Sequence, residues 1–406
     1  MYCMADYEEI TPGGVTSPAG FEAGVAACGI KKAGARKPDL MILRSTVPCI
    51  SAATFTSNQV KAAPVQVSMK HLAQGHVQAA IVNSGNANAC NGQQGLDDAA
   101  EMAQLAAKAL GLSKQQVFVE STGVIGTPMP MERLRPQIPI AASLSIDPLP
   151  PAQAIMTSDT VPKQLARRFD LDGYAISLGG MAKGAGMICP NMATMLCFIT
   201  TDAAIDAACL QTLTRRAVEH SFNRITIEGD MSTNDSVLVL ANGRAGNPPI
   251  TDPDSPAGTL FYHHLHAVAL YLAKMIIRDA EKATRFIELR VRGAKSDGDA
   301  HVVAKAVANS VLVKCAWNAG QPYWGRIMHA IGYAGVPIEE TSISIDFNGV
   351  AATRQGTSAG SSIEAMREAC DQDEVIIDID LSLGEGQTTV YTSDISENFV
   401  EFNLLD

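Results

Sequence analysis

The segment from Gly179 to Asp202 reads GGMAKGAGMICPNMATMLCFITTD. Four glycines and a proline precede the small pair Ala193-Thr194, and the residues that follow, up to Ile199, are mostly apolar. Glycine adopts positive φ angles readily and lets the backbone approach other groups closely, so this loop can bend sharply before a strand. The segment therefore predicts a strained turn that ends on a threonine at the start of a buried strand.

A hydroxyl in that position can attack the carbonyl carbon before it. Ester formation and hydrolysis would cut the chain between Ala193 and Thr194 and leave Thr194 as a new N-terminus. A free α-amine titrates near pH 8, about two and a half units below lysine, so it can take the proton of its own hydroxyl without a histidine. Two other interpretations stay open: a plain glycine-rich turn, and a phosphate-binding loop, although the spacing around Lys183 fits neither common phosphate-loop pattern.

The bulk composition narrows the class of protein. The chain has 406 residues, 47% hydrophobic and 18% charged, which is typical of a folded protein larger than one core. Its net charge is −11 and its longest basic cluster is Arg215-Arg216, so we expect no nucleic-acid partner. The longest apolar stretch, 267–277, is interrupted by Lys274 and is too short to span a bilayer, so we expect no membrane partner.

Cysteine and histidine usage predicts neither a disulfide framework nor a metal site. The nine cysteines include no Cys-x-x-Cys pair, which indicates reduced thiols. His263, His264 and His266 cluster on a predicted helix, but no third ligand type lies nearby. Because the first ten residues contain no apolar run, we expect a cytoplasmic protein. An organelle matrix is the alternative if a targeting segment precedes this sequence.

Periodicity predicts both helices and strands. A short strand at 116–120 leads to Ser121-Thr122-Gly123, and the Pro-, Asp- and Gly-rich stretch 243–258 is expected to be an exposed loop. The mixture predicts an α+β fold with helices layered on antiparallel or mixed sheets. Apolar stripes predict helices at 95–110, 206–220 and 258–277. Strict alternation of apolar and polar residues predicts half-buried strands at 287–292, 343–347 and 377–381.

Seven blocks, in the same order along the chain, resemble the ornithine acetyltransferase family, the glutamate N-acetyltransferases of arginine biosynthesis. The block KGAGMICPNMATML, which begins at Lys183, is similar to the self-cleavage segment of that family. The similarity runs from about residue 10 to residue 403, and ordered blocks are far more specific than one short motif. The other blocks are FTSNQVKAAPV from Phe55, VNSGNANAC from Val82, STGVIG from Ser121, SFNRIT from Ser221, DMSTND from Asp230 and PYWGR from Pro322.

The resemblance implies a role for individual residues. Thr194 matches the family threonine that cuts the chain after Ala193 and then accepts the acetyl group. Thr122 and Gly123 match the pair that forms the oxyanion hole. Lys183 matches a substrate-binding lysine that could hold a carboxylate or support the oxyanion. Thr194 also matches a residue that contacts substrate, and the family's other substrate-binding residues match Thr160, Glu281 and Asn403. Without the resemblance, these residues would be taken for a turn, a helix cap and solvated charges.

The resemblance also implies an activity and an assembly. Acetyl would pass from N2-acetyl-L-ornithine to L-glutamate through acetyl-Thr194, with no metal or organic cofactor and with acetyl-CoA left open as a second donor. The fold would be a layered α/β sandwich of the self-processing N-terminal-nucleophile type. Chains 1–193 and 194–406, the second with a smaller lobe at about 285–406, would form an (αβ)2 heterotetramer. A self-processed amidohydrolase or aminopeptidase, and a non-catalytic relative, are the rival interpretations.

The sequence departs from the family pattern near the expected substrate contacts. Ala280 and Lys282 flank Glu281, where the family usually has glycines, and Gln321 and Tyr323 replace the common Asp and Asn before the tryptophan. The family tail also continues to a threonine that contacts substrate, whereas this sequence ends at residue 406. We expect these differences to change substrate affinity and specificity and to leave the cleavage segment intact.

Overall fold

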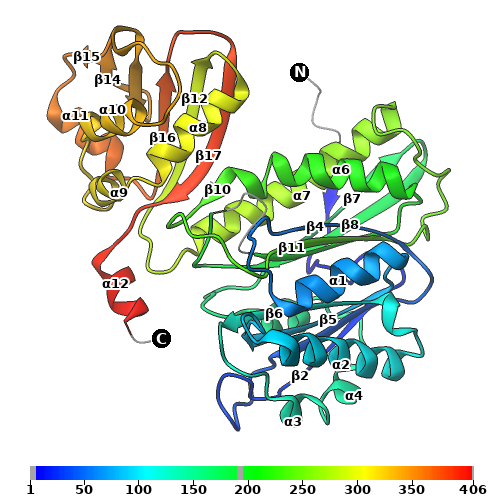
Figure 1. The fold of residues 1–406 in the computed structure, drawn as a ribbon. Coiled ribbons are helices and arrows are strands. Elements are labelled where there is room, and N and C mark those ends of the chain that lie inside the picture. Colours follow the sequence, from blue (N-terminus) through cyan, green and yellow to red (C-terminus); the bar gives the residue numbers. More distant parts are fainter. Residues whose placement is uncertain (1–5, 190–194, 405–406) are drawn as a thin grey trace. The chain divides into compact units, whose positions relative to one another are not determined.

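The computed structural model describes residues 6–189 and 195–404 (Figure 1). The chain divides into two compact units, each described here by itself. The predicted lobe at about 285–406 lies within unit 2, which begins earlier. The division into chains 1–193 and 194–406 stays a prediction, because the peptide bond between residues 193 and 194 lies outside the described residues. Unit 1 consists of Met1–Gly184, Pro190–Asn223 and Met231–Ile276, and unit 2 consists of Ala185–Cys189, Arg224–Asp230 and Ile277–Asp406.

Unit 1 contains two mixed β-sheets. In the larger sheet β9 and β11 are parallel, in the smaller sheet β5 and β6 are parallel, and the other neighbours are antiparallel. The six-stranded sheet has the order β1 (Tyr7–Glu9), β7 (Lys163–Leu171), β8 (Tyr174–Lys183), β9 (Leu196–Thr201), β11 (Ser236–Ala241), β4 (Ile50–Phe55). The four-stranded sheet has the order β2 (Phe21–Ala26), β3 (Leu40–Ser45), β5 (Ala79–Asn86), β6 (Val117–Val124).

Helices cover the outer faces of these sheets. The predicted helices 95–110, 206–220 and 258–277 are confirmed as α2, α6 and α7. Helix α6 begins where the Asp206 carboxylate accepts the backbone N–H groups of Ala208 and Cys209. The helices and 3-10 turns of this unit are α1 (Ala63–Gln74), α2 (Gly92–Leu110), η1 (Lys114–Gln116), α3 (Met131–Leu134), α4 (Ile138–Ala141), α5 (Leu149–Ala154), α6 (Ala207–Glu219), η2 (Phe222–Arg224, whose last residue belongs to unit 2) and α7 (Pro256–Arg278, whose last two residues belong to unit 2).

Alternation along the strands explains how the layers pack. Met41 and Leu43 of β3 lie in a buried cluster with Phe198 of β9, between the two sheets. Leu40 and Ile42 point the other way and join the cluster formed with α1 and α2. Unit 1 is therefore layered as helices, six-stranded sheet, four-stranded sheet, helices (Figure 1). The predicted α+β class with layered sheets is confirmed.

Helix α7 packs on β8 of the six-stranded sheet. A Cβ added to Gly180 of β8 would lie 2.9 Å from Val268 Cγ1 and 3.0 Å from Leu272 Cδ1, so glycine permits this close approach. Half of the most apolar part of α7 is buried. By length and composition alone the helix is long enough to cross a membrane, but core helices pass the same test. Its burial explains its apolar sequence.

Unit 2 is built on one seven-stranded sheet. Ile287, Leu289 and Val291 of β12 point into the core with Ile377 of β16, and the residues between them face the other side. The predicted strands 287–292, 343–347 and 377–381 are confirmed as β12, β13 and β16. The sheet order is β10 (Ile225–Thr226), β17 (Gly386–Ser393), β12 (Phe286–Ala294), β16 (Glu374–Asp380), β13 (Ser344–Phe347), β14 (Val350–Arg354), β15 (Thr357–Ser358). The helices are α8 (Asp297–Ala308), α9 (Val311–Asn318), α10 (Trp324–Gly332), α11 (Ile363–Cys370) and α12 (Glu397–Asn403), with the 3-10 turn η3 (Glu340–Ser342).

Candidate active site

Thr122 and Gly123 lie near the carboxyl end of β6, beside the end of β5. The parallel register places Thr122 opposite Ser84 and Gly123 opposite Gly85. Thr122 is half-buried and Gly123 is exposed, whereas Ser121 before them is buried. A hydroxyl and a backbone N–H that reach the surface at a strand end are the kind of donors that an oxyanion hole requires.

Gly123 is held in a conformation that needs glycine. Its φ angle is +135°, and an added Cβ would lie 2.3 Å from the Gly85 carbonyl carbon. We expect Gly123→Ala to separate the ends of β5 and β6, displace the amide and lower kcat by about 100-fold, the cost of losing one oxyanion donor. At Gly126, which also has a positive φ, an added Cβ would meet nothing within 4 Å. Steady-state kinetics should show that Gly126→Ala keeps most activity, and equal losses in both variants would contradict the prediction.

Lys183 is not the solvated loop lysine that its sequence context alone suggests. It is the last residue of β8, its exposed fraction is 8%, and its Nζ donates a hydrogen bond to Thr122 Oγ1 at 3.2 Å. An ammonium group can only donate hydrogen bonds, so the Thr122 oxygen is the acceptor in this contact. The hydroxyl proton of Thr122 is therefore available to another acceptor, such as a developing oxyanion.

Asp159 anchors the chain around Lys183. Its Oδ1 accepts hydrogen bonds from Lys163 Nζ and from the Gly184 N–H, each at 2.7 Å, and its Oδ2 accepts the Thr157 N–H at 3.0 Å. The side chains of Asp159 and Lys163 are fully buried. Burial raises the Asp159 pKa, but the charges of Lys183 and Lys163 and the Gly184 hydrogen bond outweigh it and lower the pKa to about 2. Asp159 is therefore ionised at neutral pH.

The sequence analysis missed Asp159 and Lys163. The available signal was their spacing of four residues in TSDTVPK, next to Thr160. Thr160 itself is exposed and directly follows the buried aspartate. In unit 1 the structure therefore brings Lys183 and Thr122 into contact, places Gly123 beside Thr122, and links Thr160 to them through its neighbour in the chain. Ala193 and Thr194 lie outside the described residues.

Glu281 and Asn403 come together in unit 2, with the glycine-rich segment Ala185–Cys189. Asn403 Nδ2 donates a hydrogen bond to Glu281 Oε2 at 3.3 Å, and the Glu281 N–H donates to the Ala185 carbonyl at 2.9 Å. A Cβ added to Gly186 would lie 2.5 Å from the Glu281 carboxyl group. The absence of a side chain at 186 is therefore what lets this carboxylate lie against the segment.

Lys282 shows the effect of one departure from the family pattern. Its φ angle is +55°, in the left-handed region that favours glycine. The Ser396 hydroxyl donates to its carbonyl oxygen at 2.7 Å, and its ammonium lies 5.2 Å from the centre of the Phe402 ring. The turn after Glu281 thus keeps a glycine-like conformation, which contacts of the lysine stabilise.

Glu228 and Lys314 influence each other electrostatically beside the segment Ala185–Cys189. Glu228 accepts the Ile188 N–H, and burial raises its pKa to about 8. Burial lowers the pKa of Lys314 to about 7; its Nζ donates to Thr392 Oγ1 and to the Ser393 carbonyl. The sequence analysis missed both residues, because a single Glu and a single Lys carry no local motif.

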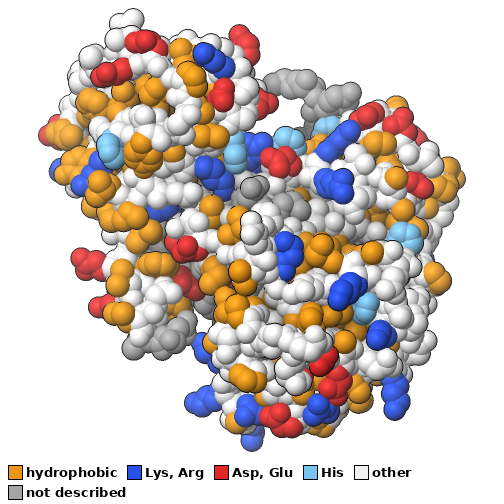
Figure 2. All heavy atoms as spheres, viewed as in Figure 1, with side chains coloured by type: hydrophobic (Ala, Val, Ile, Leu, Met, Phe, Trp, Pro, Cys, Tyr) orange, Lys and Arg blue, Asp and Glu red, His pale blue; other side chains and the backbone are white. Residues whose placement is uncertain are grey.

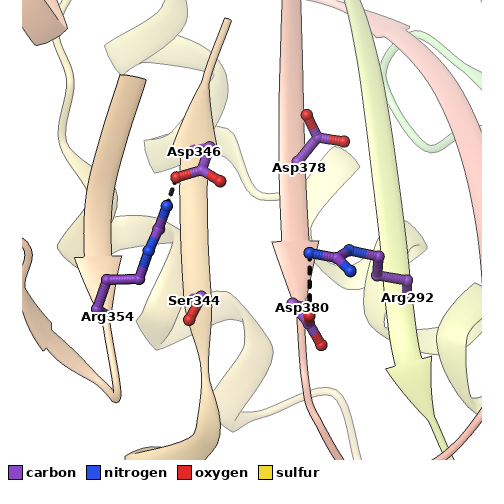
Figure 3. Close-up of a pocket in the computed structure, with 6 residues that line it drawn as sticks. All are labelled: Arg292, Ser344, Asp346, Arg354, Asp378 and Asp380. Carbon is purple, nitrogen blue, oxygen red and sulfur yellow. Dashed lines mark hydrogen bonds and ion pairs between the residues drawn. The ribbon is translucent and has the colours of Figure 1, made fainter. Parts of the chain in front are cut away.

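The exposed face of the unit 2 sheet holds a charged hollow of about 260 Å³ (Figure 3). Arg354 pairs with Asp346 at 2.6 Å, and Arg292 pairs with Asp380 at 3.0 Å. These charges neutralise one another, and we assign no ligand to the hollow. Its lining is completed by Ser344 and Asp378.

In the described part of the chain, neither the distribution of charged side chains nor the arrangement of possible metal ligands indicates a further site. On the face shown in Figure 2, lysine and arginine side chains are scattered among acidic and apolar ones. Within residues 6–189 and 195–404, no group of three or more His, Cys, Asp or Glu side chains is arranged to hold a metal ion. His264, from the predicted histidine cluster, stacks on the Phe169 ring at 3.8 Å, and burial lowers its pKa to about 4.

Comparison with known proteins identifies the family. The model of the ArgJ family matches residues 22–404. An arginine biosynthesis bifunctional protein ArgJ from Symbiobacterium thermophilum is 47% identical over 96% of this chain and 98% of its own length. Its counterpart from Geobacter sulfurreducens is 46% identical over 95% of this chain and 98% of its own. The crystal structure of the ArgJ protein from Bacillus halodurans is 38% identical, with a TM-score of 0.50, and covers 52% of this chain and 98% of that chain. As its sequence blocks predicted, the chain belongs to the ArgJ family.

Proposed function

We propose that this protein cuts itself between Ala193 and Thr194 and then transfers acetyl from N2-acetyl-L-ornithine to L-glutamate through an ester on Thr194. Membership of the ArgJ family makes it an acetyltransferase; the donor, the acceptor and the nucleophile are the proposal. The observation that carries it is the hydrogen bond from Lys183 to Thr122, because it leaves the Thr122 proton free for an oxyanion.

The transfer takes two balanced steps. Thr194 Oγ attacks the acetyl carbon of the donor while the α-amine of Thr194 takes the hydroxyl proton and returns it to the leaving ornithine nitrogen. Thr122 and Gly123 donate to the oxyanion and contribute roughly 3–4 kcal/mol each. The amine of glutamate then attacks the ester and regenerates the hydroxyl. Lys183, Thr160, Glu281 and Asn403 bind the substrates, and a carboxylate such as Glu281 suits an ammonium group.

The comparisons support two chains and a second activity. The match to the Bacillus halodurans structure covers 98% of that chain but only 52% of this one. Residues 194–406 make up about the same share of this chain, as expected if the related protein consists of two chains. The relatives' names describe a bifunctional protein, which supports a second activity, and we propose acetyl-CoA as its acetyl donor. The proposal includes a cytoplasmic (αβ)2 assembly and requires no metal or organic cofactor.

Intact mass and product analysis test this proposal together. We expect two fragments that separate at residue 193, and N-acetylglutamate that forms from N2-acetyl-L-ornithine only when L-glutamate is present. Acetate released at a rate independent of glutamate would instead show a hydrolase, and no product at all would show a non-catalytic relative. An active chain that is continuous through position 194 would overturn the mechanism.

A further inference from the structure

The sequence block DMSTND, which begins at Asp230, contains a buried amide that the mechanism above does not use. Asn234 lies two residues before β11, and its exposed fraction is 5%. Its Nδ2 donates one hydrogen bond to the Ala87 carbonyl at 2.6 Å and another to the Ser121 carbonyl at 2.8 Å. A side-chain amide has two N–H groups, so both are used on main-chain acceptors. Ala87 directly follows β5 and Ser121 belongs to β6, so this one side chain joins the two strands near their ends.

The amide group of Asn234 is held in one orientation. The Thr233 hydroxyl donates to Asn234 Oδ1 at 2.6 Å. A rotated amide would point its oxygen at two carbonyl oxygens, and acceptors with no proton between them repel one another. The main chain on either side is also fixed, because the Ala62 N–H donates to the Thr233 carbonyl and the Thr56 N–H to the Asp235 carbonyl, each at 2.9 Å. Asn234 is therefore a rigid support.

The bond to Ser121 acts directly before the predicted oxyanion donors. The Ser121 carbonyl and the Thr122 N–H belong to one planar peptide unit, so a bond to that carbonyl fixes where the Thr122 side chain begins. The ladder between β5 and β6 is irregular here, since its register shifts at Gly85 and Asn86, beside Gly123. Asn234, which lies outside the four-stranded sheet, supplies a constraint at the point where the ladder becomes irregular.

The bond to Ala87 acts on the other side of the donors. The Ala87 N–H donates to the Val124 carbonyl at 2.9 Å, while the Ala87 carbonyl accepts from Asn234. Asn234 thus holds the residue before Thr122 directly and the residue after Gly123 through Ala87. The two donors lie between main-chain points that are connected to the same amide.

The placement of these donors decides how much they contribute. Oxyanion donors stabilise a transition state only when they point at the position where its charge develops, and a displacement of about 1 Å can cost about 100-fold in rate. The bond from Lys183 Nζ reaches the Thr122 hydroxyl oxygen. That bond does not hold the main chain that carries the Gly123 N–H, whereas the two bonds of Asn234 do.

We propose that Asn234 is a positioning residue of the oxyanion hole: it holds the Thr122 hydroxyl and the Gly123 N–H in place without contacting the substrate. This inference rests on the proposed function, in which Thr122 and Gly123 stabilise the oxyanion. It assigns a role to a sequence block for which that function gives none.

Steady-state kinetics of Asn234→Ala test this role. We expect kcat per cut molecule to fall by about 100-fold with little change in the KM for N2-acetyl-L-ornithine, because the oxyanion forms only in the transition state. Asn247→Ala is the matched control. Asn247 is 4% exposed and its Nδ2 also donates to two carbonyls, those of Ala204 at 3.1 Å and Pro248 at 2.8 Å, but beyond the opposite end of β11. The control should lose comparable stability in thermal melting and keep its kcat.

Hydrogen–deuterium exchange tests the positioning without relying on activity. In Asn234→Ala the amides of residues 121–124 should exchange faster by about 10-fold or more, because the bonds that hold this strand end are lost. Their exchange should be unchanged in Asn247→Ala. Thr233→Val, which is similar in shape, removes only the bond to Asn234 Oδ1 and should give a kcat between those of the unchanged protein and Asn234→Ala. It serves as the test if the alanine variant does not fold.

The results that would overturn the role of Asn234 differ from those that would refute the proposed function. Equal losses of kcat in the two alanine variants, or unaltered exchange at residues 121–124 in Asn234→Ala, would show that Asn234 serves only the fold. An unchanged protein that forms no N-acetylglutamate would refute the proposed function instead. The exchange measurement would then still decide whether Asn234 holds this strand end.

Discussion

Replacing Thr194 with alanine is expected to leave one continuous chain of 406 residues and to abolish acetyl transfer. The variant has no hydroxyl to attack the Ala193 carbonyl, and without the cut no α-amine forms that could act as a base. Because the same residue supplies the nucleophile and the base, both losses should be complete to the detection limit, a rate loss of at least about 10⁴-fold. Intact mass and the appearance of N-acetylglutamate measure the two effects separately.

Thr194→Ser is the control for this experiment. It keeps a hydroxyl and, after cutting, an α-amine, so it should be cut and should retain measurable transfer. An uncut alanine variant that still produced N-acetylglutamate would mean that another side chain carries the acetyl group. Proteolysis by a contaminant would be recognised because it would cut the alanine variant as well.

Asp159→Asn is expected to have the largest effect on stability. It would remove the carboxylate that pairs with the buried Lys163 ammonium, and breaking such a pair costs about 3–5 kcal/mol of unfolding free energy. It would also weaken the acceptor of the Gly184 N–H and remove the charge facing Lys183, so transfer should fall as well. Urea denaturation and steady-state kinetics report these losses.

A second substitution separates folding from positioning. Adding Lys163→Met removes the stranded charge, so the double variant should regain most of the stability. It should not regain transfer, because Gly184 and Lys183 still lack their anionic partner. Recovery of both properties in the double variant would show that Asp159 serves only the fold.

Asp159 also predicts how stability depends on pH. Its pKa in the folded protein, about 2, is below the ordinary value of 3.8, so its contribution is complete above about pH 4. That contribution, about 2 kcal/mol, is lost as the pH falls from about 4 to about 2. Denaturation curves of Asp159→Asn/Lys163→Met should lack this part of the acid dependence.

Local patterns predicted the class of fold and most of its elements. Strict alternation around Leu289 and Ile377 gave two strands within a few residues, and the apolar stripe of α6 gave a helix to within a residue at each end. The order of strands could not be read in this way. Sheet neighbours such as β4 and β11 lie far apart in the sequence, and their pairing depends on packing across the unit.

The candidate site was predicted through motifs, and its supports were not. Thr122 and Lys183 lie in recognisable blocks, whereas Asp159 matters because of its burial and its contact with Gly184, which is distant in the sequence. An acidic residue in a sequence is normally solvated, so nothing local separates a buried aspartate from an exposed one. Only the three-dimensional neighbours of Asp159 show that this carboxyl group is buried and held ionised.

The strand order of the larger sheet of unit 1 has a consequence for the protein that the proposed cut would produce. Strands β9 and β11 follow residue 194, and they lie between β8 and β4, which both precede it. After the cut, the two strands of the 194–406 fragment would therefore be hydrogen-bonded on both sides to strands of the 1–193 fragment, β8 on one side and β4 on the other. Once denatured, the two fragments must meet again by diffusion, so the yield of refolded protein should depend on protein concentration. The uncut Thr194→Ala variant is one chain, so its refolding yield should not change on dilution.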